Sequence, residues 1–171
     1  CTGSKNSVYE NIDWIKQLKH FVLELHKNQK LFVGVCFGHQ MMGEALGGKV
    51  MKSPGGWNVG VHHFEMLAKE KWMDPFQGKM NLLMMCQDQV VEMPPNSKLL
   101  AKTAFCPVGM FTVGETMLGI QAHPEFPASY EKALLTDRVD RIGNEKVERA
   151  LDSLKMKTDR DLLAGWIMRF L

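Results

Sequence analysis

The sequence predicts an α/β domain in which helices flank a mostly parallel central sheet, in three layers. Three observations support this fold class. An amphipathic helix pattern precedes residue 28, a short apolar run follows at 31–35, and a glycine-containing turn leads from that run into a second helix. A continuous apolar run without alternation is typical of a strand buried on both faces, as in a parallel sheet. The order of helix, buried strand, turn and helix therefore favours an α/β architecture.

Two helices are predicted in the first part of the chain. Ser7 and Glu10 form the Ser-x-x-Glu pattern of a helix N-terminus. Behind them, apolar residues recur at three- and four-residue steps up to about Asn28, which places them on one helix face: Val8, Ile12, Ile15, Leu18, Val22 and Leu25. The second helix is expected to begin near Gly38 and to end at Gly47-Gly48, a common helix C-terminal signal.

The middle of the chain is expected to consist mainly of strands, and the last part of helices. The expected strands are 31–35, 59–66, 80–86, 99–104, 110–113 and 117–122, the last two in a hairpin-like arrangement. After Pro127, the pattern predicts two or three amphipathic helices up to Leu171, and the charged residues from Glu131 to Lys157 are interpreted as a solvated face. No repeat or linker divides the chain, so residues 1–171 are interpreted as a single domain.

Composition argues against several classes of protein. The chain has 21 basic and 19 acidic residues, a net charge of +2 and no run of five like charges, so nucleic-acid binding is not expected. No apolar stretch approaches the roughly 18 residues needed to span a bilayer, so membrane insertion is not expected either. The four cysteines, at 1, 36, 86 and 106, match neither a metal site nor a redox pair. Together with the lack of a secretory signal pattern, they favour a reducing, cytoplasmic location.

A nucleophile elbow is indicated at Gly34-Val35-Cys36-Phe37-Gly38, between the buried strand and the second helix. In this motif the nucleophile sits on a sharp turn, and small flanking residues let the backbone pass close by. The Phe37 N–H would face the negative charge that develops on the substrate oxygen. The positive end of the helix favours a thiolate. The alternative is a buried cysteine at a strand end, flanked by glycines for packing.

The second motif is Gln121-Ala122-His123-Pro124-Glu125-Phe126. Residues two apart in an extended segment point the same way, so Glu125 can hold the imidazole of His123. A cysteine nucleophile needs such a base and such an orienting group. Taken alone, the motif favours a solvated surface turn around Pro124. Taken with the elbow, it indicates a triad of Cys36, His123 and Glu125.

The two motifs resemble the signature pair of class I glutamine amidotransferases, which have a flavodoxin-like fold. The resembling segments are Gly-Val-Cys-Phe-Gly-His-Gln at 34–40 and Gly-Ile-Gln-Ala-His-Pro-Glu-Phe at 119–126. Further segments are similar to the family's oxyanion strand, to its glutamine-pocket lining and to its His-x-Asp-x-Val stretch: residues 2–4, 56–61 and 87–90. The resemblance covers roughly residues 1–126 and is closest to stand-alone, GMP-synthetase-like members, which include γ-glutamyl peptidases.

The resemblance implies a role for each matching residue. Cys36 would attack the γ-carbonyl of glutamine or a γ-glutamyl compound and form a thioester. His123 would activate the thiol and protonate the leaving amine, and Glu125 would orient His123. The resemblance also implies an oxyanion hole from the N–H groups of Gly3 and Phe37, and a contact from Gln40 to the glutamyl group. No cofactor or metal is implied. Separately, Trp57 is a candidate wall of the substrate pocket, with core packing as the alternative.

Two departures from the family stand out. The family has about fifty more residues before the position of Gly3, which form a central strand, a helix and a further strand. The N-terminal strands are therefore expected to be missing from this chain, which is read as N-terminally incomplete or as docked to an N-terminal companion fragment, because a sheet without a central strand would expose unpaired backbone. The family histidine of the His-x-Asp stretch is replaced by Gln87, which bears on substrate preference.

Three functions from different classes remain open at this point. The first is a hydrolase that acts alone on γ-glutamyl amides or peptides. The second is a glutaminase subunit that delivers ammonia to a separate synthetase partner, since the chain after Phe126 lacks a phosphate-binding glycine loop. The third is a non-catalytic relative that only binds a small molecule. The intact Cys36, His123 and Glu125 argue against the third.

Overall fold

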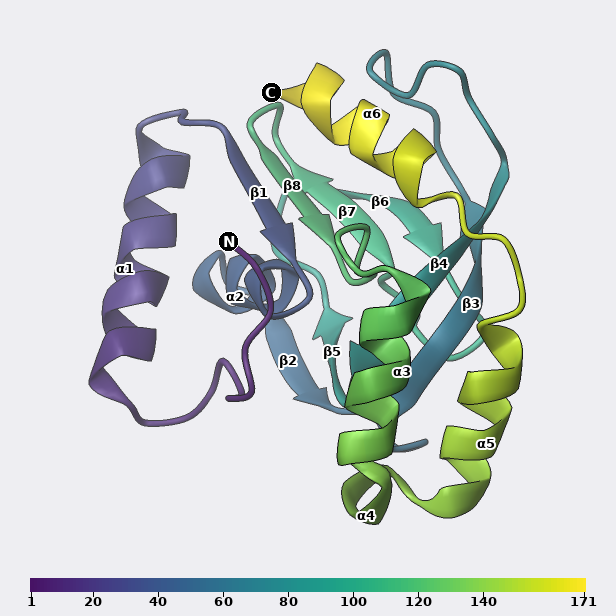
Figure 1. Cartoon of the computed structure of the whole chain (residues 1–171). Coiled ribbons are helices and arrows are strands. Elements are labelled where there is room, and N and C mark those ends of the chain that lie inside the picture. The colour runs from purple at the N-terminus through teal and green to yellow at the C-terminus, as the bar shows by residue number, and fades with distance from the viewer.

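The computed structural model describes all residues, 1–171, as six helices and eight strands (Figure 1). In chain order the elements are α1 (Asp13–Lys27), β1 (Phe32–Val35), α2 (Phe37–Ala45), β2 (Lys49–Lys52), β3 (Asn58–Met66), β4 (Lys79–Cys86), β5 (Asp88–Glu92), β6 (Ser97–Lys102), β7 (Met110–Val113), β8 (Met117–Ile120), α3 (Ala128–Asp137), α4 (Val139–Ile142), α5 (Asn144–Ser153) and α6 (Arg160–Phe170). The mixture of helices and strands confirms the α/β class.

The central sheet is mixed rather than mostly parallel. Its six strands have the order β1-β8-β7-β6-β3-β4, and only the pairing of β1 with β8 is parallel. The expectation of a mostly parallel sheet is therefore wrong for these strands. Residues 114–116 suffice to join β7 to β8 as an antiparallel hairpin, whereas a parallel crossover needs a dozen or more residues. The one parallel pair joins two short apolar runs, β1 and β8.

Helices cover both faces of this sheet. Apolar side chains of α1 and α2, including Ile15, Val22 and Met41, pack in one core with Phe111 and Met117 of β7 and β8. A second core joins the sheet to α6, whose Leu163, Trp166 and Phe170 belong to it, and a third joins β4 to α3, α4 and α5. Figure 1 shows α1 and α2 on one side of the sheet and α3, α5 and α6 on the other. This layering confirms the helix-flanked arrangement.

Several element boundaries differ from the sequence prediction. The first helix begins at Asp13 instead of near Ser7, because the Ser7 hydroxyl donates to Asp88 and does not cap a helix. The strands β2 and β5, which form a separate two-stranded sheet, were not predicted. The last part of the chain forms four helices where two or three were expected.

The first and last parts of the chain both approach the central sheet. The amino group of Cys1 donates to the Val33 carbonyl and the Val35 N–H donates to the Cys1 carbonyl, each at 2.8 Å, so residue 1 lies along the free edge of β1.

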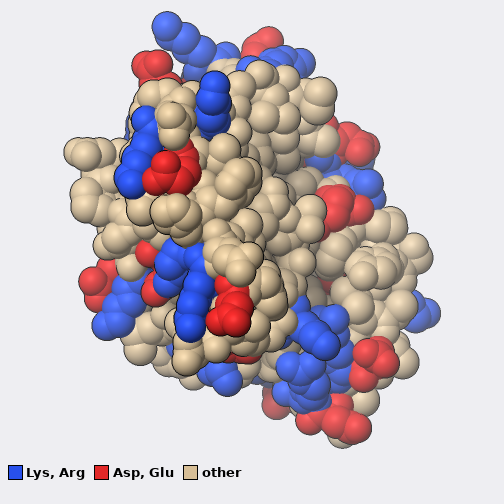
Figure 2. Space-filling view, turned by 90° about the vertical axis from the view of Figure 1, so that its left-hand side faces the viewer, with Lys and Arg blue, Asp and Glu red and all other residues tan.

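On the face seen in Figure 2, basic and acidic side chains lie close to one another among uncharged surface. No helix is both long and apolar enough to cross a bilayer.

Candidate active site

Cys36 occupies a strained turn between β1 and α2. Its backbone has φ 51° and ψ −101°, a conformation that L-residues rarely adopt, and such strain is concentrated at functional sites. A Cβ on Gly34 would lie 2.3 Å from the Gly38 carbonyl oxygen, and a Cβ on Gly38 would lie 2.3 Å from the Cys1 carbonyl oxygen. Both contacts are impossible for a larger residue. Gly34 is therefore required for the chain to make this turn, and Gly38 is required for Cys1 to pack against it.

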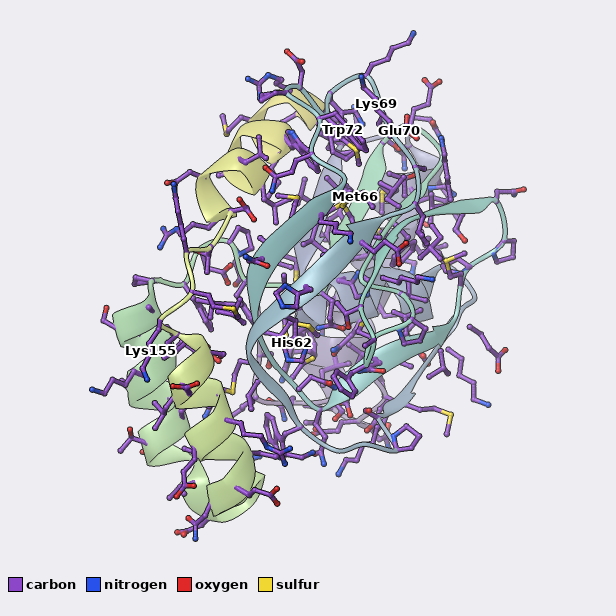
Figure 3. The ribbon with its side chains drawn as sticks, turned by 90° about the vertical axis from the view of Figure 1, so that its right-hand side faces the viewer. His62, Met66, Lys69, Glu70, Trp72 and Lys155 are labelled. Carbon is purple, nitrogen blue, oxygen red and sulfur yellow. The ribbon has the colours of Figure 1, made fainter.

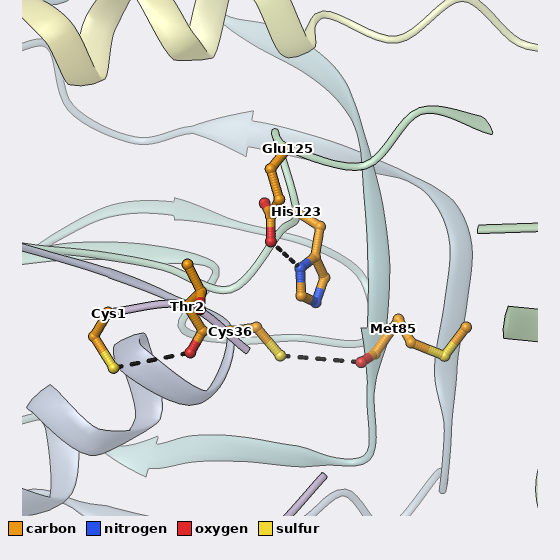
Figure 4. A network of polar contacts seen from close by, with 6 residues as sticks. All are labelled: Cys1, Thr2, Cys36, Met85, His123 and Glu125. Carbon is orange, nitrogen blue, oxygen red and sulfur yellow. Dashed lines mark hydrogen bonds and ion pairs between the residues drawn. The ribbon is translucent and has the colours of Figure 1, made fainter. Parts of the chain in front are cut away.

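His123 and Glu125 follow β8 and lie beside the turn. The Nδ1 atom of His123 is 2.8 Å from Oε1 of Glu125, and Figure 4 shows the imidazole between this carboxylate and the side chain of Cys36. The His123 N–H donates to the Leu83 carbonyl of β4 at 2.8 Å, which fixes its backbone. The ring of Phe126 stacks on the imidazole at 4.0 Å between centroids. His123 is therefore buried and held from three directions.

The surroundings of His123 favour its protonated form. Burial by itself lowers the pKa of this imidazole, but hydrogen bonds to Cys36 and Glu125, together with the charges of both groups, outweigh it and raise the pKa to about 10. At neutral pH the imidazole is thus held as a cation beside the sulfur atom. A cation in this position is what stabilises a cysteine nucleophile as a thiolate.

The two expected oxyanion donors are Gly3, which lies beside Cys36 and His123, and Phe37, which directly follows Cys36 in the chain. Gly3 lies against the pair, because a Cβ on it would be 3.1 Å from Cε1 of His123 and 4.0 Å from Cβ of Cys36. Neither the Gly3 N–H nor the Phe37 N–H donates to any protein acceptor. Free donors at this point are able to bind an oxygen atom that carries developing negative charge.

Two cavities meet at Cys36. One has a volume of about 400 Å³ and is lined by Gly3, His123, Phe126 and Tyr130, among others. The other, of about 200 Å³, is lined mainly by polar residues. The sulfur of Cys36 lies 4.0 Å from the carbonyl oxygen of Met85, and both residues border both cavities. A substrate whose scissile bond lies at Cys36 can therefore place the groups on the two sides of that bond in different cavities.

The family model of glutamine amidotransferase class-I matches residues 4–141. The chain belongs to the class-I glutamine amidotransferase family. The chain is 33% identical over 151 residues to "Gamma-glutamyl peptidase 5" of Arabidopsis thaliana; the match covers 85% of the chain and 59% of the peptidase. It is also 35% identical over 125 residues to a GMP synthase of Hydrogenovibrio crunogenus, covering 67% of the chain and 24% of that enzyme. The chain thus spans less than two thirds of either relative.

The fold of the chain also matches solved structures. A glutamine amidotransferase of Thermotoga maritima superimposes with a TM-score of 0.83 at 21% identity, covering 98% of this chain and 75% of that one. This likeness supports the helix-flanked α/β fold.

Gln40 and Trp57, the two expected substrate contacts, both line the smaller cavity with Cys36. The Gln40 amide Nε2 donates to the Asp88 carbonyl at 2.7 Å and to Oε1 of Gln121 at 3.1 Å. These bonds hold the Gln40 side chain in a fixed orientation. Trp57 is half-buried, and the guanidinium of Arg141 lies over its ring at 5.6 Å from the centroid.

Helix α3 contributes residues that sequence reasoning missed. Tyr130, Leu134 and Arg138 line the larger cavity, and Arg138 also lines the smaller one. Their spacing of four residues, continued backwards to Phe126, was the available signal for one helix face. Glu131 on the same helix is fully buried, so its interpretation as part of a solvated face is wrong.

No cluster of three or more His, Cys, Asp or Glu side chains is arranged to hold a metal ion.

Proposed function

We propose that this amidotransferase hydrolyses the γ-amide bond of γ-glutamyl peptides through a thioester on Cys36. The sulfur of Cys36 attacks the γ-carbonyl carbon and forms a C–S bond. The carbonyl oxygen takes up negative charge, and the N–H groups of Gly3 and Phe37 bind it. The C–N bond then breaks, and the leaving amine takes its proton from His123.

Hydrolysis of the thioester completes the cycle. The neutral imidazole of His123 accepts a proton from a water molecule, whose oxygen bonds to the γ-carbonyl carbon. The C–S bond breaks, glutamate leaves and the sulfur of Cys36 is regenerated. Glu125 keeps the imidazole in one orientation during both steps, as the 2.8 Å contact with Nδ1 supports. The sum is one amide and one water converted to glutamate and one amine.

The observation that carries the choice of substrate is the pair of cavities at Cys36. The smaller cavity holds charges of both signs, which suits the amino and carboxylate groups of a glutamyl substrate; its charged lining residues are Lys5, Lys52, Arg138, Arg141, Glu10 and Asp88. The larger cavity, about 400 Å³, lies on the side of His123, where the leaving amine takes its proton. Ammonia would leave most of this volume unused, whereas the remainder of a peptide would fill it.

A second candidate function is a glutaminase that supplies ammonia to a synthetase. The match to a GMP synthase favours it, because that match covers only 24% of the synthase. A glutaminase of this kind would act on free glutamine and would depend on a partner chain for its full rate.

Steady-state kinetics on the purified protein distinguishes the two functions. Glutamine and a set of γ-glutamyl dipeptides with increasingly large second residues serve as substrates, and the Cys36→Ala variant serves as control. The peptidase proposal predicts that kcat/KM for the dipeptides exceeds that for glutamine by at least about tenfold, without any partner. A higher kcat/KM for glutamine than for every dipeptide would reject the peptidase and favour the glutaminase.

A further inference from the structure

We propose that a groove that Cys36 does not line, between α5, β3 and the loop 103–107, is a binding site for a small organic anion with a planar apolar body. The groove has a volume of about 830 Å³, larger than either cavity at Cys36. Volumes of about 300–1,000 Å³ are typical of small-molecule sites. Neither Cys36 nor His123 lines it, so the proposed hydrolysis does not use it.

The apolar part of the groove is open to solvent. Phe105 is 67% exposed and Val91 is 39% exposed, and both line the groove. The ring of Phe105 lies edge-on to the imidazole of His62 at 6.1 Å between centroids and 88° between planes. Figure 3 shows His62 on β3, near α5. Two perpendicular rings beside an open apolar wall offer a planar ligand one face to stack on and one edge to contact.

The charged residues that line the groove are all basic. Lys102, Lys146 and Arg149 line it, and no Asp or Glu does. Lys146 forms no salt bridge, and its ammonium group donates only to the carbonyl oxygens of Gly55 and Trp57. Its positive charge is therefore uncompensated by any carboxylate.

The other two cations are paired only at the surface. Lys102 lies 3.6 Å from the carboxylate of Glu65, and Arg149 lies 2.9 Å from the carboxylate of Glu145. Both carboxylates are largely exposed and lie outside the groove. Exposed pairs of this kind are weak and readily exchanged for another anion. Apolar walls with a net positive charge are complementary to an anion whose body is apolar.

The groove shares one wall with the cavity at Cys36. Trp57 lines both, and Arg141 lies over its ring. A ligand that packs against Trp57 in the groove thus contacts a residue that borders the candidate substrate cavity. Trp57 is therefore a wall common to the groove and to this cavity.

Fluorescence titration with 8-anilinonaphthalene-1-sulfonate tests the proposal, because this probe combines a planar apolar body with one negative charge. N-phenyl-1-naphthylamine, which has the same rings without the sulfonate, is the matched neutral probe. We expect the protein to bind the sulfonate at least about fivefold more tightly than the neutral probe. We also expect Phe105→Ala and Arg149→Met each to weaken binding of the sulfonate by about fivefold or more.

Two control variants locate the binding. Phe21→Ala removes a similarly exposed ring on α1, and Lys155→Met removes an exposed charge just beyond α5; neither residue lines the groove. Both controls should bind the sulfonate like the parent protein. Lys146→Met adds a third groove variant, and thermal unfolding shows whether each variant is folded. Equal affinity for the two probes, or undiminished binding in the folded Phe105→Ala and Arg149→Met variants, would overturn the proposal.

Discussion

The buried carboxylate of Glu131 accepts a hydrogen bond from the N–H of Gly60, at 3.2 Å, and so joins α3 to β3. Its other oxygen is buried and has no hydrogen-bond partner. Burial raises the pKa of Glu131 to about 7, although the bond from Gly60 and the charges of His123 and Arg138 oppose the rise. The fold thus places a carboxyl group with an unusually high pKa behind the candidate active site.

Glu131→Gln should stabilise the protein in alkaline solution. The pKa of Glu131 is about 7 in the folded state and near 4.5 without burial, so between these values the folded state binds more protons and stability falls as pH rises. Glutamine keeps an acceptor for Gly60 but carries no charge. Urea unfolding should show a gain on the order of 1–3 kcal/mol near pH 8 that disappears towards pH 4.5. An equal gain in the free energy of unfolding at both pH values would contradict the raised pKa of Glu131.

Gly3→Ala should impair catalysis with little effect on stability. The added methyl group would lie 3.1 Å from Cε1 of His123, so the imidazole must shift from its position beside Cys36 by a few tenths of an ångström. We expect kcat/KM to fall at least about tenfold, because misplacement of a catalytic group is costly. Gly78→Ala is the matched control, since a methyl group there meets nothing within 4 Å. Full activity in Gly3→Ala would show that this contact does not constrain His123.

Glu125→Gln should slow turnover less than the loss of Cys36 or His123. In the proposed mechanism the carboxylate orients the imidazole and does not itself bond to the substrate, and the orienting group is usually the least costly member to lose. The measurement compares the loss of kcat in three variants: Glu125→Gln, Cys36→Ala and His123→Ala. Glu115→Gln, which changes an exposed carboxylate on the β7–β8 turn, should leave kcat unchanged. If Glu125→Gln were as damaging as Cys36→Ala, Glu125 would need a role beyond orientation.

The pH profile should reflect the raised pKa of His123. The leaving amine takes its proton from the imidazolium, so kcat/KM should fall as pH rises through about 10, where the imidazolium is lost. The bond and charge of Glu125 contribute to that pKa. In Glu125→Gln the alkaline fall should therefore move to lower pH. If kcat/KM fell at the same alkaline pH in both proteins, the titration of His123 would not be the cause of that fall.

The site around Cys36 was predictable because its constraints are local. Gly34 allows one sharp turn because a side chain there would meet the backbone of Gly38, and two residues in an extended segment bring Glu125 to His123. Each of these relationships spans only a few residues. Periodicity and apolar runs likewise located most of the strands, since each signal belongs to one element.

Features that depend on distant contacts were not predictable. The direction of strands in the sheet depends on which strands become neighbours, and an apolar run alone does not give this information. Glu131 looks like a surface residue on an amphipathic helix, and only the approach of Gly60 on β3, 71 residues away, buries it. The role of α3 in lining the cavity at Cys36 arises in the same way, because the cavity is formed only when α3 packs over β4.

Mass spectrometry of an acylated intermediate tests the central claim most directly. The purified protein is mixed with a γ-glutamyl dipeptide, quenched in acid during turnover and digested. The proposed mechanism predicts one glutamyl group on the peptide that contains Cys36, and no adduct on peptides with Cys1, Cys86 or Cys106. Hydrolysis of the dipeptide with an adduct on another residue, or undiminished hydrolysis by Cys36→Ala, would contradict the mechanism.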